Sequence, residues 1–244
     1  MGDGGSVTGN PEQAGTTWCV LVAAGAGTRL GGDLPKAFAP LAGRPLLAES
    51  LERLDLSDWI DAIVVVAPPE WEEPTILLAE ELVVSKVAAV VTGGATRADS
   101  VAAGLAEVPD EALVVLVHDA ARPLVTDAVI ERVIGGLSDG SAGAVPTMPV
   151  SDTVKSVRAG RVVETVDRSA LVAVQTPQAF VADRLRAAYA NRAGEATDCA
   201  ALVEVAGGLV SVVAGDSRLL KVTDADDLRR IEAWLAETTL DGAA

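Results

Sequence analysis

The chain begins its regular structure with WCVLVAAGAGTRL, residues 18–30, in which a short aliphatic run passes directly into a glycine-rich loop. The run at 18–24 lacks the alternation of polar and apolar residues that a strand with one solvent-exposed face shows, so it predicts a strand buried on both faces. Glycines in the loop let backbone N–H groups approach an anion closely. A buried strand that ends in such a loop is typical of an open α/β sheet, whose ligands bind outside the carboxyl ends of the strands.

Six further aliphatic runs follow the first and predict six more fully buried strands. They lie at 62–68, 86–91, 112–119, 142–148, 171–177 and 209–215. Segments with helical patterns separate them, at 46–54, 71–83, 97–106, 126–137, 180–192, 198–206 and 224–237. Thr223 precedes the last helix and is predicted to cap it. This alternation predicts a doubly wound, mostly parallel α/β sheet.

The composition excludes several classes of protein. The 244 residues include 35 acidic and 19 basic side chains, a net charge of −16, which disfavours binding to nucleic acid or to an anionic membrane surface. No apolar run has the roughly 18–20 residues of a membrane span, and residues 1–15 read as a disordered tail rather than a signal peptide. The two cysteines lie far apart, so we expect reduced thiols and a cytoplasmic protein.

Residues 150–170 break the strand–helix rhythm. Two alternating segments flank Arg158-Ala159-Gly160, which predicts a β-hairpin. We interpret it as an arm that projects from a single domain spanning residues 16–238. An isolated hairpin is only marginally stable, so we expect the arm to pack against a second subunit.

The first loop offers a phosphate site. Gly25 and Gly27 supply close backbone approach, while Arg29 and Lys36 supply positive charge. The loop does not fit the dinucleotide fingerprint, because Leu30 occupies the third glycine position, and no GK[ST] phosphate loop is present. A tight turn without a ligand is the alternative interpretation.

Three later clusters lie at predicted strand ends. Gly93-Gly94 precedes a predicted helix, whose N-terminus can bind an anion or the polar edge of a ligand. The alternative is that Asp99 and Ser100 only cap that helix. Asp119 ends the fourth predicted strand, where a carboxylate is a natural Mg²⁺ ligand. His118 is interpreted as a packed, hydrogen-bonded side chain. Lys221 follows the last strand and either reaches the same face or lies in solvent.

These motifs together resemble a known family. From about residue 18 to residue 234 the chain is similar to the 2-C-methyl-D-erythritol 4-phosphate cytidylyltransferases of the non-mevalonate isoprenoid pathway. The motifs that carry the resemblance are, in order, AAGAGTRL, PKAF, GGATRADSV, VHDAARP, SDTVK, TVDR, QTPQAF, ATDCAAL and LLKVTDADDL. The resemblance implies a Rossmann-like nucleotidyltransferase fold and a homodimer joined by the arm. It also implies Mg²⁺-dependent transfer of CMP from CTP to methylerythritol phosphate, giving 4-diphosphocytidyl-2-C-methyl-D-erythritol and pyrophosphate.

The resemblance also implies three groups of site residues. Those that stabilise charge in the transition state are Arg29, Lys36 and Lys221. Those that bind the nucleotide are Ala23, Ala24, Gly25, Gly27, Gly94, Ser100 and Ala120. Those that bind the acceptor are Asp119, which also holds the metal, with Arg122, Thr153, Arg168 and Thr176. Thr153 and Arg168 are implied to reach the site of the neighbouring subunit.

Some positions depart from the family pattern, and alternatives stay open. Ala37 stands where a glutamine is common, and Ala95 and Cys199 stand where acidic residues are often found. A related branch uses ribitol 5-phosphate, and other nucleotidyltransferases activate hexose phosphates or molybdopterin. A nucleotide-binding domain without turnover is the non-enzymatic alternative. We expect no fused cyclodiphosphate synthase domain after residue 244.

Overall fold

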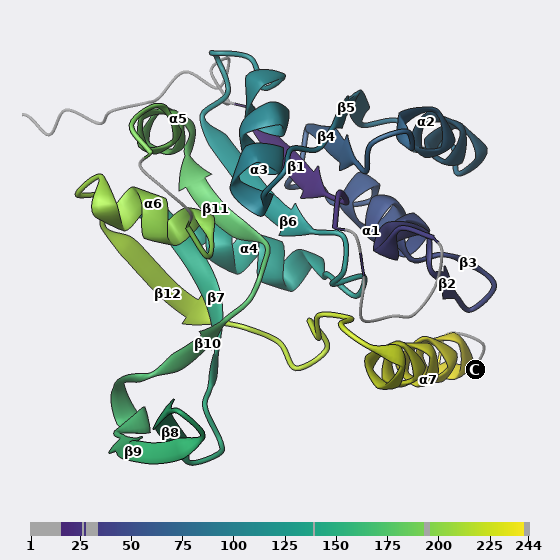
Figure 1. Ribbon diagram of the computed structural model, residues 1–244. Helices are drawn as coiled ribbons and strands as arrows, with labels where there is room; N and C mark the ends of the chain where they lie inside the picture. Colours follow the sequence, from purple (N-terminus) through teal and green to yellow (C-terminus); the bar gives the residue numbers. More distant parts are fainter. Residues whose placement is uncertain (1–15, 26, 28–33, 139, 193–195, 242–244) are drawn as a thin grey trace, which may run out of the picture.

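The computed structural model describes residues 16–25, 27, 34–138, 140–192 and 196–241 (Figure 1). The predicted tail at 1–15 and Arg29 lie outside the described residues.

An eight-stranded sheet forms the centre of the described chain, in the order β10-β7-β11-β6-β1-β4-β5 with β12 paired to β7. The strands are β1 (Thr17–Val22), β4 (Ala62–Ala67), β5 (Val87–Thr92), β6 (Val114–Asp119), β7 (Gly143–Pro149), β10 (Val172–Val174), β11 (Gln178–Val181) and β12 (Val210–Ala214). Parallel pairs join β1 to β4 and β6, β4 to β5, and β7 to β12. Only β10 and β11 pair antiparallel to their neighbours in this sheet. The predicted mostly parallel sheet is confirmed.

Helices cover both faces of the sheet, as a doubly wound fold requires (Figure 1). They are α1 (Leu46–Asp55), α2 (Glu72–Glu81), α3 (Arg97–Ala106), α4 (Asp127–Gly135), α5 (Ala182–Ala190), α6 (Cys199–Val205) and α7 (Ala225–Asp241). Among the described helices, no segment combines the length and hydropathy of a bilayer-crossing helix.

The two faces have separate aliphatic cores, and successive strand residues alternate between them. Val64 and Val66 of β4 belong to the core that includes residues of α3, α5 and α6, whereas Ile63 and Val65 belong to the core that includes residues of α1, α2 and α4. Both faces are therefore apolar, which explains why the strand shows no alternation in sequence. A third, smaller cluster joins α7 to the hairpin of β2 (Pro40–Leu41) and β3 (Arg44–Pro45) through Leu41 and Ile231.

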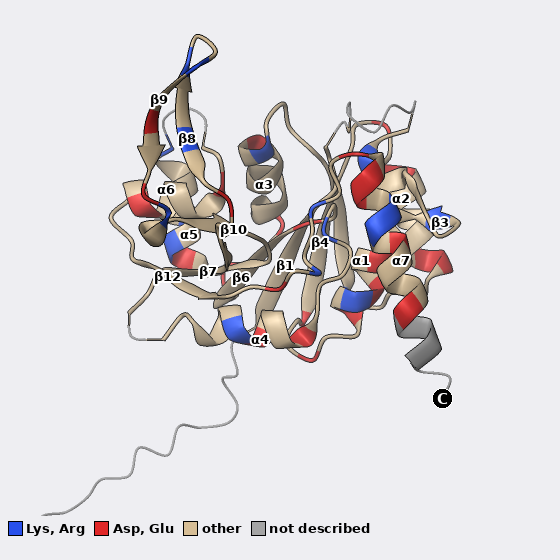
Figure 2. Cartoon of the chain, turned by 90° about the horizontal axis from the view of Figure 1, so that it is seen from below, with Lys and Arg blue, Asp and Glu red and all other residues tan. Residues whose placement is uncertain are grey.

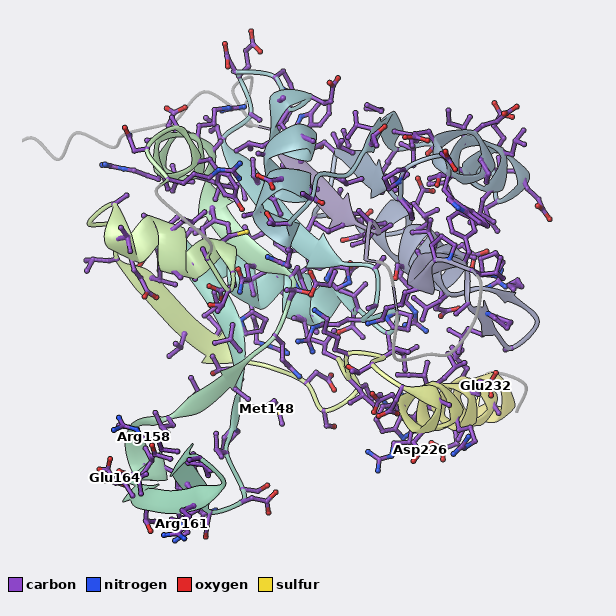
Figure 3. All side chains as sticks on the ribbon, viewed as in Figure 1. Met148, Arg158, Arg161, Glu164, Asp226 and Glu232 are labelled. Carbon is purple, nitrogen blue, oxygen red and sulfur yellow. The ribbon has the colours of Figure 1, made fainter. Side chains whose placement is uncertain are left out.

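The predicted arm is a separate two-stranded hairpin that projects from the lower edge of the sheet (Figures 1 and 3). It consists of β8 (Val154–Arg158) and β9 (Arg161–Val166). Ala159 and Gly160 at its tip have φ of 48° and 73°. Two successive positive φ values give the primed turn that matches the twist of a hairpin. Figure 2 shows basic residues at this tip, while acidic residues gather on α1 and α7.

Three predictions about elements are wrong. The strands β5, β10 and β12 are not fully buried, since no residue of β5 is fully buried and Val172 and Val212 are 47% and 63% exposed. Residues 180–181 belong to the strand β11, so the helix predicted from 180 begins at Ala182. Asp224 rather than Thr223 caps α7, because its carboxylate accepts the N–H groups of Asp226 and Asp227.

Candidate active site

A pocket of about 510 Å³ lies at the carboxyl ends of β1 and β6. The chain runs outward from β1 to β4 and β5 and then returns to place β6 on the other side of β1. The pocket therefore occupies the switch point at which open α/β sheets bind ligands. Its described lining includes Ala23, Ala24, Gly25, Gly27, Lys36, Gly94, Arg97, Ser100, Asp119, Ala120, Lys221 and Thr223.

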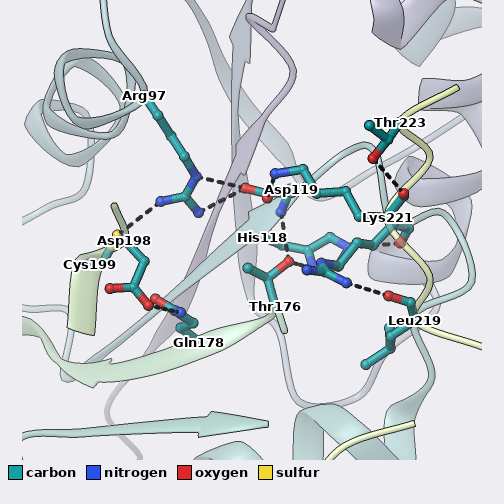
Figure 4. A network of polar contacts seen from close by, with 11 residues as sticks. Arg97, His118, Asp119, Thr176, Gln178, Asp198, Cys199, Leu219, Lys221 and Thr223 are labelled. Carbon is teal, nitrogen blue, oxygen red and sulfur yellow. Dashed lines mark hydrogen bonds and ion pairs between the residues drawn. The ribbon is translucent and has the colours of Figure 1, made fainter. Parts of the chain in front are cut away.

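Asp119, the last residue of β6, is held by two cations in this pocket (Figure 4). Arg97 Nε and Nη2 donate to its Oδ1 at 3.0 and 2.8 Å, and Lys221 Nζ donates to its Oδ2 at 2.6 Å. Burial alone would raise the pKa of Asp119, but the charges of Arg97 and Lys221 outweigh it and hold the pKa well below its usual range. The carboxylate is therefore ionised and fixed in orientation.

A chain of hydrogen bonds also fixes the backbone of Asp119. Its backbone N–H donates to Thr176 Oγ1 at 3.1 Å, and that hydroxyl lies 3.2 Å from His118 Nδ1. His118 Nε2 lies 3.1 Å from the carbonyl oxygen of Arg122. Burial lowers the pKa of His118 to about 4, so the ring is neutral and donates from Nε2 while Nδ1 accepts from Thr176. The prediction that His118 is a packed, hydrogen-bonded residue is confirmed.

The turn at 93–100 forms the opposite wall. The N–H of Gly94 donates to Ser100 Oγ at 3.1 Å, and this hydroxyl donates to the carbonyl of Thr96 at 3.0 Å. Thr96 and Asp99 form a reciprocal capping box at the start of α3, so the capping interpretation of Asp99 is correct. A Cβ at Gly94 would lie 2.3 Å from that of Asp99, which explains glycine at this position.

The predicted site residues fall into three spatial groups. Those that line the pocket are Ala23, Ala24, Gly25, Gly27, Lys36, Gly94, Ser100, Asp119, Ala120 and Lys221. Two others support it without lining it: Thr176 lies beneath Asp119, and Arg122 Nη1 donates to the carbonyl of Leu219 at 2.5 Å. Thr153 and Arg168 lie at the arm, and Arg168 lines a second pocket of about 690 Å³.

Arg97 is a pocket residue that the sequence-based list of candidates omits. It is the first residue of α3, and besides Asp119 it contacts Cys199 Sγ at 3.7 Å. Burial lowers its pKa, but the charge of Asp119 outweighs this and raises the pKa further above its ordinary value. Its place in the GGATR motif could have indicated a cation at a helix start that faces the strand ends.

The described lining contains one carboxylate, that of Asp119, and the described residues contain no group of three acidic, histidine or cysteine side chains that could hold a metal. Mg²⁺ is commonly held by one or two carboxylates together with substrate phosphates. Two N–H donors occupy Oδ1 of Asp119 and one occupies Oδ2, so a carboxylate lone pair is left on Oδ2. The site therefore fits a magnesium ion that arrives with a phosphate ligand.

Comparison with known proteins identifies relatives over nearly the whole chain. Residues 17–237 match the family model for 2-C-methyl-D-erythritol 4-phosphate cytidylyltransferase. The protein of that name from Nocardia farcinica is 50% identical over 234 residues, covering 96% of this chain and 97% of the relative. Its counterpart in Saccharopolyspora erythraea is 48% identical over 222 residues, covering 89% of this chain and 98% of the relative.

A solved structure of the same family also matches the fold of this chain. The crystal structure of the enzyme of this name from Thermus thermophilus superposes with a TM-score of 0.73 at 34% identity, covering 89% of this chain and 98% of that one. The chain therefore belongs to the 2-C-methyl-D-erythritol 4-phosphate cytidylyltransferase family, and it is a nucleotidyltransferase that joins CMP from CTP to that polyol phosphate.

Proposed function

We propose that CTP binds in the pocket between β1, β6 and α3, and that the reaction takes place beside Asp119. The observation that carries the proposal is the ion-paired Asp119, whose two oxygens are held by Arg97 and Lys221 at the switch point of the sheet. The triphosphate would lie along Gly25, Gly27 and Lys36, where backbone N–H groups and a cation line one wall. Arg29 would add a second cation, as the family resemblance implies.

The proposed chemistry needs no protein nucleophile. A phosphate oxygen of methylerythritol phosphate attacks the α-phosphorus of CTP in line, one P–O bond forms, and the P–O bond to the departing pyrophosphate breaks. Lys36 and Lys221 stabilise the charge that builds on the phosphate oxygens. Asp119 would hold Mg²⁺, which neutralises charge on the triphosphate when it is bound. The fixed pocket walls position the reacting atoms, which supplies much of the remaining rate enhancement.

Lys221 would change partners during this reaction. In the described structure its ammonium group is bound to Asp119 at 2.6 Å, and its side chain is 41% exposed. An entering phosphate carries more negative charge than one carboxylate and competes for the same donor. Arg97 stays on Oδ1, so Asp119 keeps its orientation when Lys221 leaves.

The turn at Gly93-Gly94 is the proposed base-reading element. Its backbone groups, braced by Ser100, can accept a hydrogen bond from the 4-amino group of cytosine. A site built for that donor leaves a buried acceptor unpaired when uracil binds, which costs affinity. We therefore expect CTP to be used in preference to UTP.

A second copy of the chain would complete the site. Val157, Val162 and Val163 are about three-fifths exposed on the arm, and the pocket at its base is open. Covering such apolar surface favours association. The homodimer would bring Thr153 and Arg168 of each arm to the acceptor in the opposite pocket. We also infer a cytoplasmic location, which suits the two free, buried cysteines.

Release of pyrophosphate tests this assignment. With CTP, Mg²⁺ and methylerythritol phosphate, we expect Lys36→Ala and Lys221→Met each to lower kcat by about 10²- to 10³-fold, by analogy with the loss of one transition-state donor. Lys86→Met is the matched control, because Lys86 bonds to the carbonyl of Ser57 away from the pocket. Near-normal kcat in both pocket variants, or equal use of CTP and UTP, would contradict the proposed site.

A further inference from the structure

The loop that carries Lys221 begins at Gly215, directly after β12, and is tied to the domain at several points. The N–H of Val222 donates to the carbonyl of Ala121 at 2.8 Å, which fixes the end of the loop. The carbonyl of Leu219 accepts from Arg122, which fixes its middle. Leu219 and Val222 are fully buried on either side of Lys221. The beginning of the loop lies four residues before Leu219 and six before Lys221, and there the N–H of Gly215 donates to the carbonyl of Thr147 at 2.9 Å.

Gln175 holds the next residue of the loop, Asp216, with both ends of its amide. Its Nε2 donates to the carbonyl of Asp216 at 2.8 Å, and its Oε1 accepts from the N–H of Asp216 at 3.1 Å. The same carbonyl of Asp216 also accepts from the N–H of Leu219 at 3.0 Å, which closes the turn that leads to Lys221, so the amide of Gln175 holds the first residue of that turn. Gln175 is 8% exposed and does not line the pocket.

The packing around this amide leaves little freedom. A Cβ on Gly215 would lie 2.3 Å from Gln175 Oε1 and 2.9 Å from the carbonyl oxygen of Thr147. Both distances are shorter than a side chain can tolerate without movement of the amide or the strand. Glycine at 215 therefore lets the loop start approach Gln175 closely enough for both hydrogen bonds.

Gln175 is also the chain neighbour of the residue that fixes Asp119. Thr176 accepts the N–H of Asp119, while Gln175 holds the loop of Lys221, so two consecutive residues control the two partners of the ion pair. The segment continues directly from β10, which ends at Val174 at the base of the arm. One short stretch of chain therefore helps to hold both the ammonium group and the carboxylate.

We propose that Gln175 is a positioning residue of the transferase reaction, which acts by holding the Asp216 turn so that Lys221 is placed opposite Asp119. This inference rests on the proposed role of Lys221. A displaced reacting group costs on the order of 10²-fold in rate for about 1 Å. Gln175→Met keeps the length and the apolar volume but removes both hydrogen bonds, so we expect kcat to fall about 10- to 100-fold with KM for CTP unchanged.

A double-mutant cycle separates positioning from a general structural role. Gln175→Met, Lys221→Met and the double variant are compared in pyrophosphate release, with thermal melting to show that each is folded. If Gln175 acts through Lys221, its substitution lowers kcat in the wild-type background but has no further effect once Lys221 is absent. Arg186→Met is the matched control, since Arg186 also makes two bonds to backbone carbonyls, those of Val108 and Pro109, away from the pocket. We expect this control to keep its turnover.

The outcomes distinguish the proposed role of Gln175 from that of Lys221. An equal loss of kcat in both backgrounds, or no loss in Gln175→Met, would overturn the role of Gln175 while leaving that of Lys221 intact. Normal turnover in Lys221→Met would overturn the role of Lys221 and this inference with it. Should Gln175→Met fail to fold, Gly215→Ala, which pushes on the same amide, takes its place in the cycle with the same expected results.

Discussion

At the scale of single residues, the site depends on one carboxylate with two cationic partners. Asp119 and Lys221 could be predicted from the sequence because Asp119 ends an aliphatic run, Lys221 follows another, and strand ends converge in an open sheet. The GGATR motif could have indicated a cation at Arg97, but the sequence does not reveal that its partner is Asp119, 22 positions further along the chain. Its pairing depends on the distance between α3 and β6, which only the folded structure sets.

The contribution of Arg97 can be measured against a matched arginine. We expect Arg97→Met to lower kcat by about 10²-fold, because Asp119 loses the partner that keeps its orientation. It should also lower the free energy of unfolding by about 2 kcal/mol, the scale of hydrogen bonds to a charged group. Steady-state kinetics and urea unfolding measure the two effects.

Arg192→Met provides the control for that substitution. Arg192 pairs with Asp99 on the same helix, outside the pocket, and its side chain is 28% exposed against 24% for Arg97. We expect this variant to lose less stability, because solvent screens the more exposed Asp99, and to keep its turnover. Equal kinetic losses in the two variants would show that Arg97 has no special part in the site.

Thr176 and Arg122 stay predicted members of the acceptor site. Both belong to motifs shared with the family, and the resemblance places them in the acceptor pocket. In the described structure Thr176 is buried beneath Asp119, and Arg122 supports the carbonyl of Leu219. A motif identifies residues that a site needs, and the structure adds which neighbouring groups those residues hold.

At the scale of elements, the predicted helices agree with the structure to within a few residues at each end. The strands at the edge of the sheet agree less well. A short aliphatic run does not reveal strand direction, so the sequence pattern assigns the end of the antiparallel β11 to the following helix. It also does not reveal what covers the outer face, so the pattern predicts a buried β12, although Val212 is 63% exposed.

The residue that caps the N-terminus of α7 can be tested by substitution. Asp224 accepts the N–H groups of Asp226 and Asp227, whereas the hydroxyl of Thr223 donates to the carbonyl of Lys221. We expect Asp224→Ala to lower the free energy of unfolding by about 1 kcal/mol, the usual value of an N-cap. Thr223→Ala is the comparison and should cost less. A larger loss in the threonine variant by chemical denaturation would argue that Thr223 is the cap after all.

At the scale of the whole molecule, the arm leaves the domain and exposes apolar surface that the single chain does not cover. The mainly acidic chain adds repulsion between copies, so the interface needs apolar contact to form. We expect wild-type protein to have the mass of two chains by light scattering, and Val162→Glu to have the mass of one with a large loss of turnover. Leu56→Glu, which changes an 80% exposed leucine at the end of α1, should leave the dimer intact. A monomeric, fully active wild type would exclude an essential second copy.

The acceptor preference is the most direct test of the central claim, that this pocket transfers CMP to a methylerythritol phosphate. The measurement is pyrophosphate release by the wild-type chain with CTP and Mg²⁺, comparing 2-C-methyl-D-erythritol 4-phosphate with ribitol 5-phosphate. We expect rapid release with the first acceptor and little with the second. Release with ribitol 5-phosphate alone, or with neither acceptor, would contradict it.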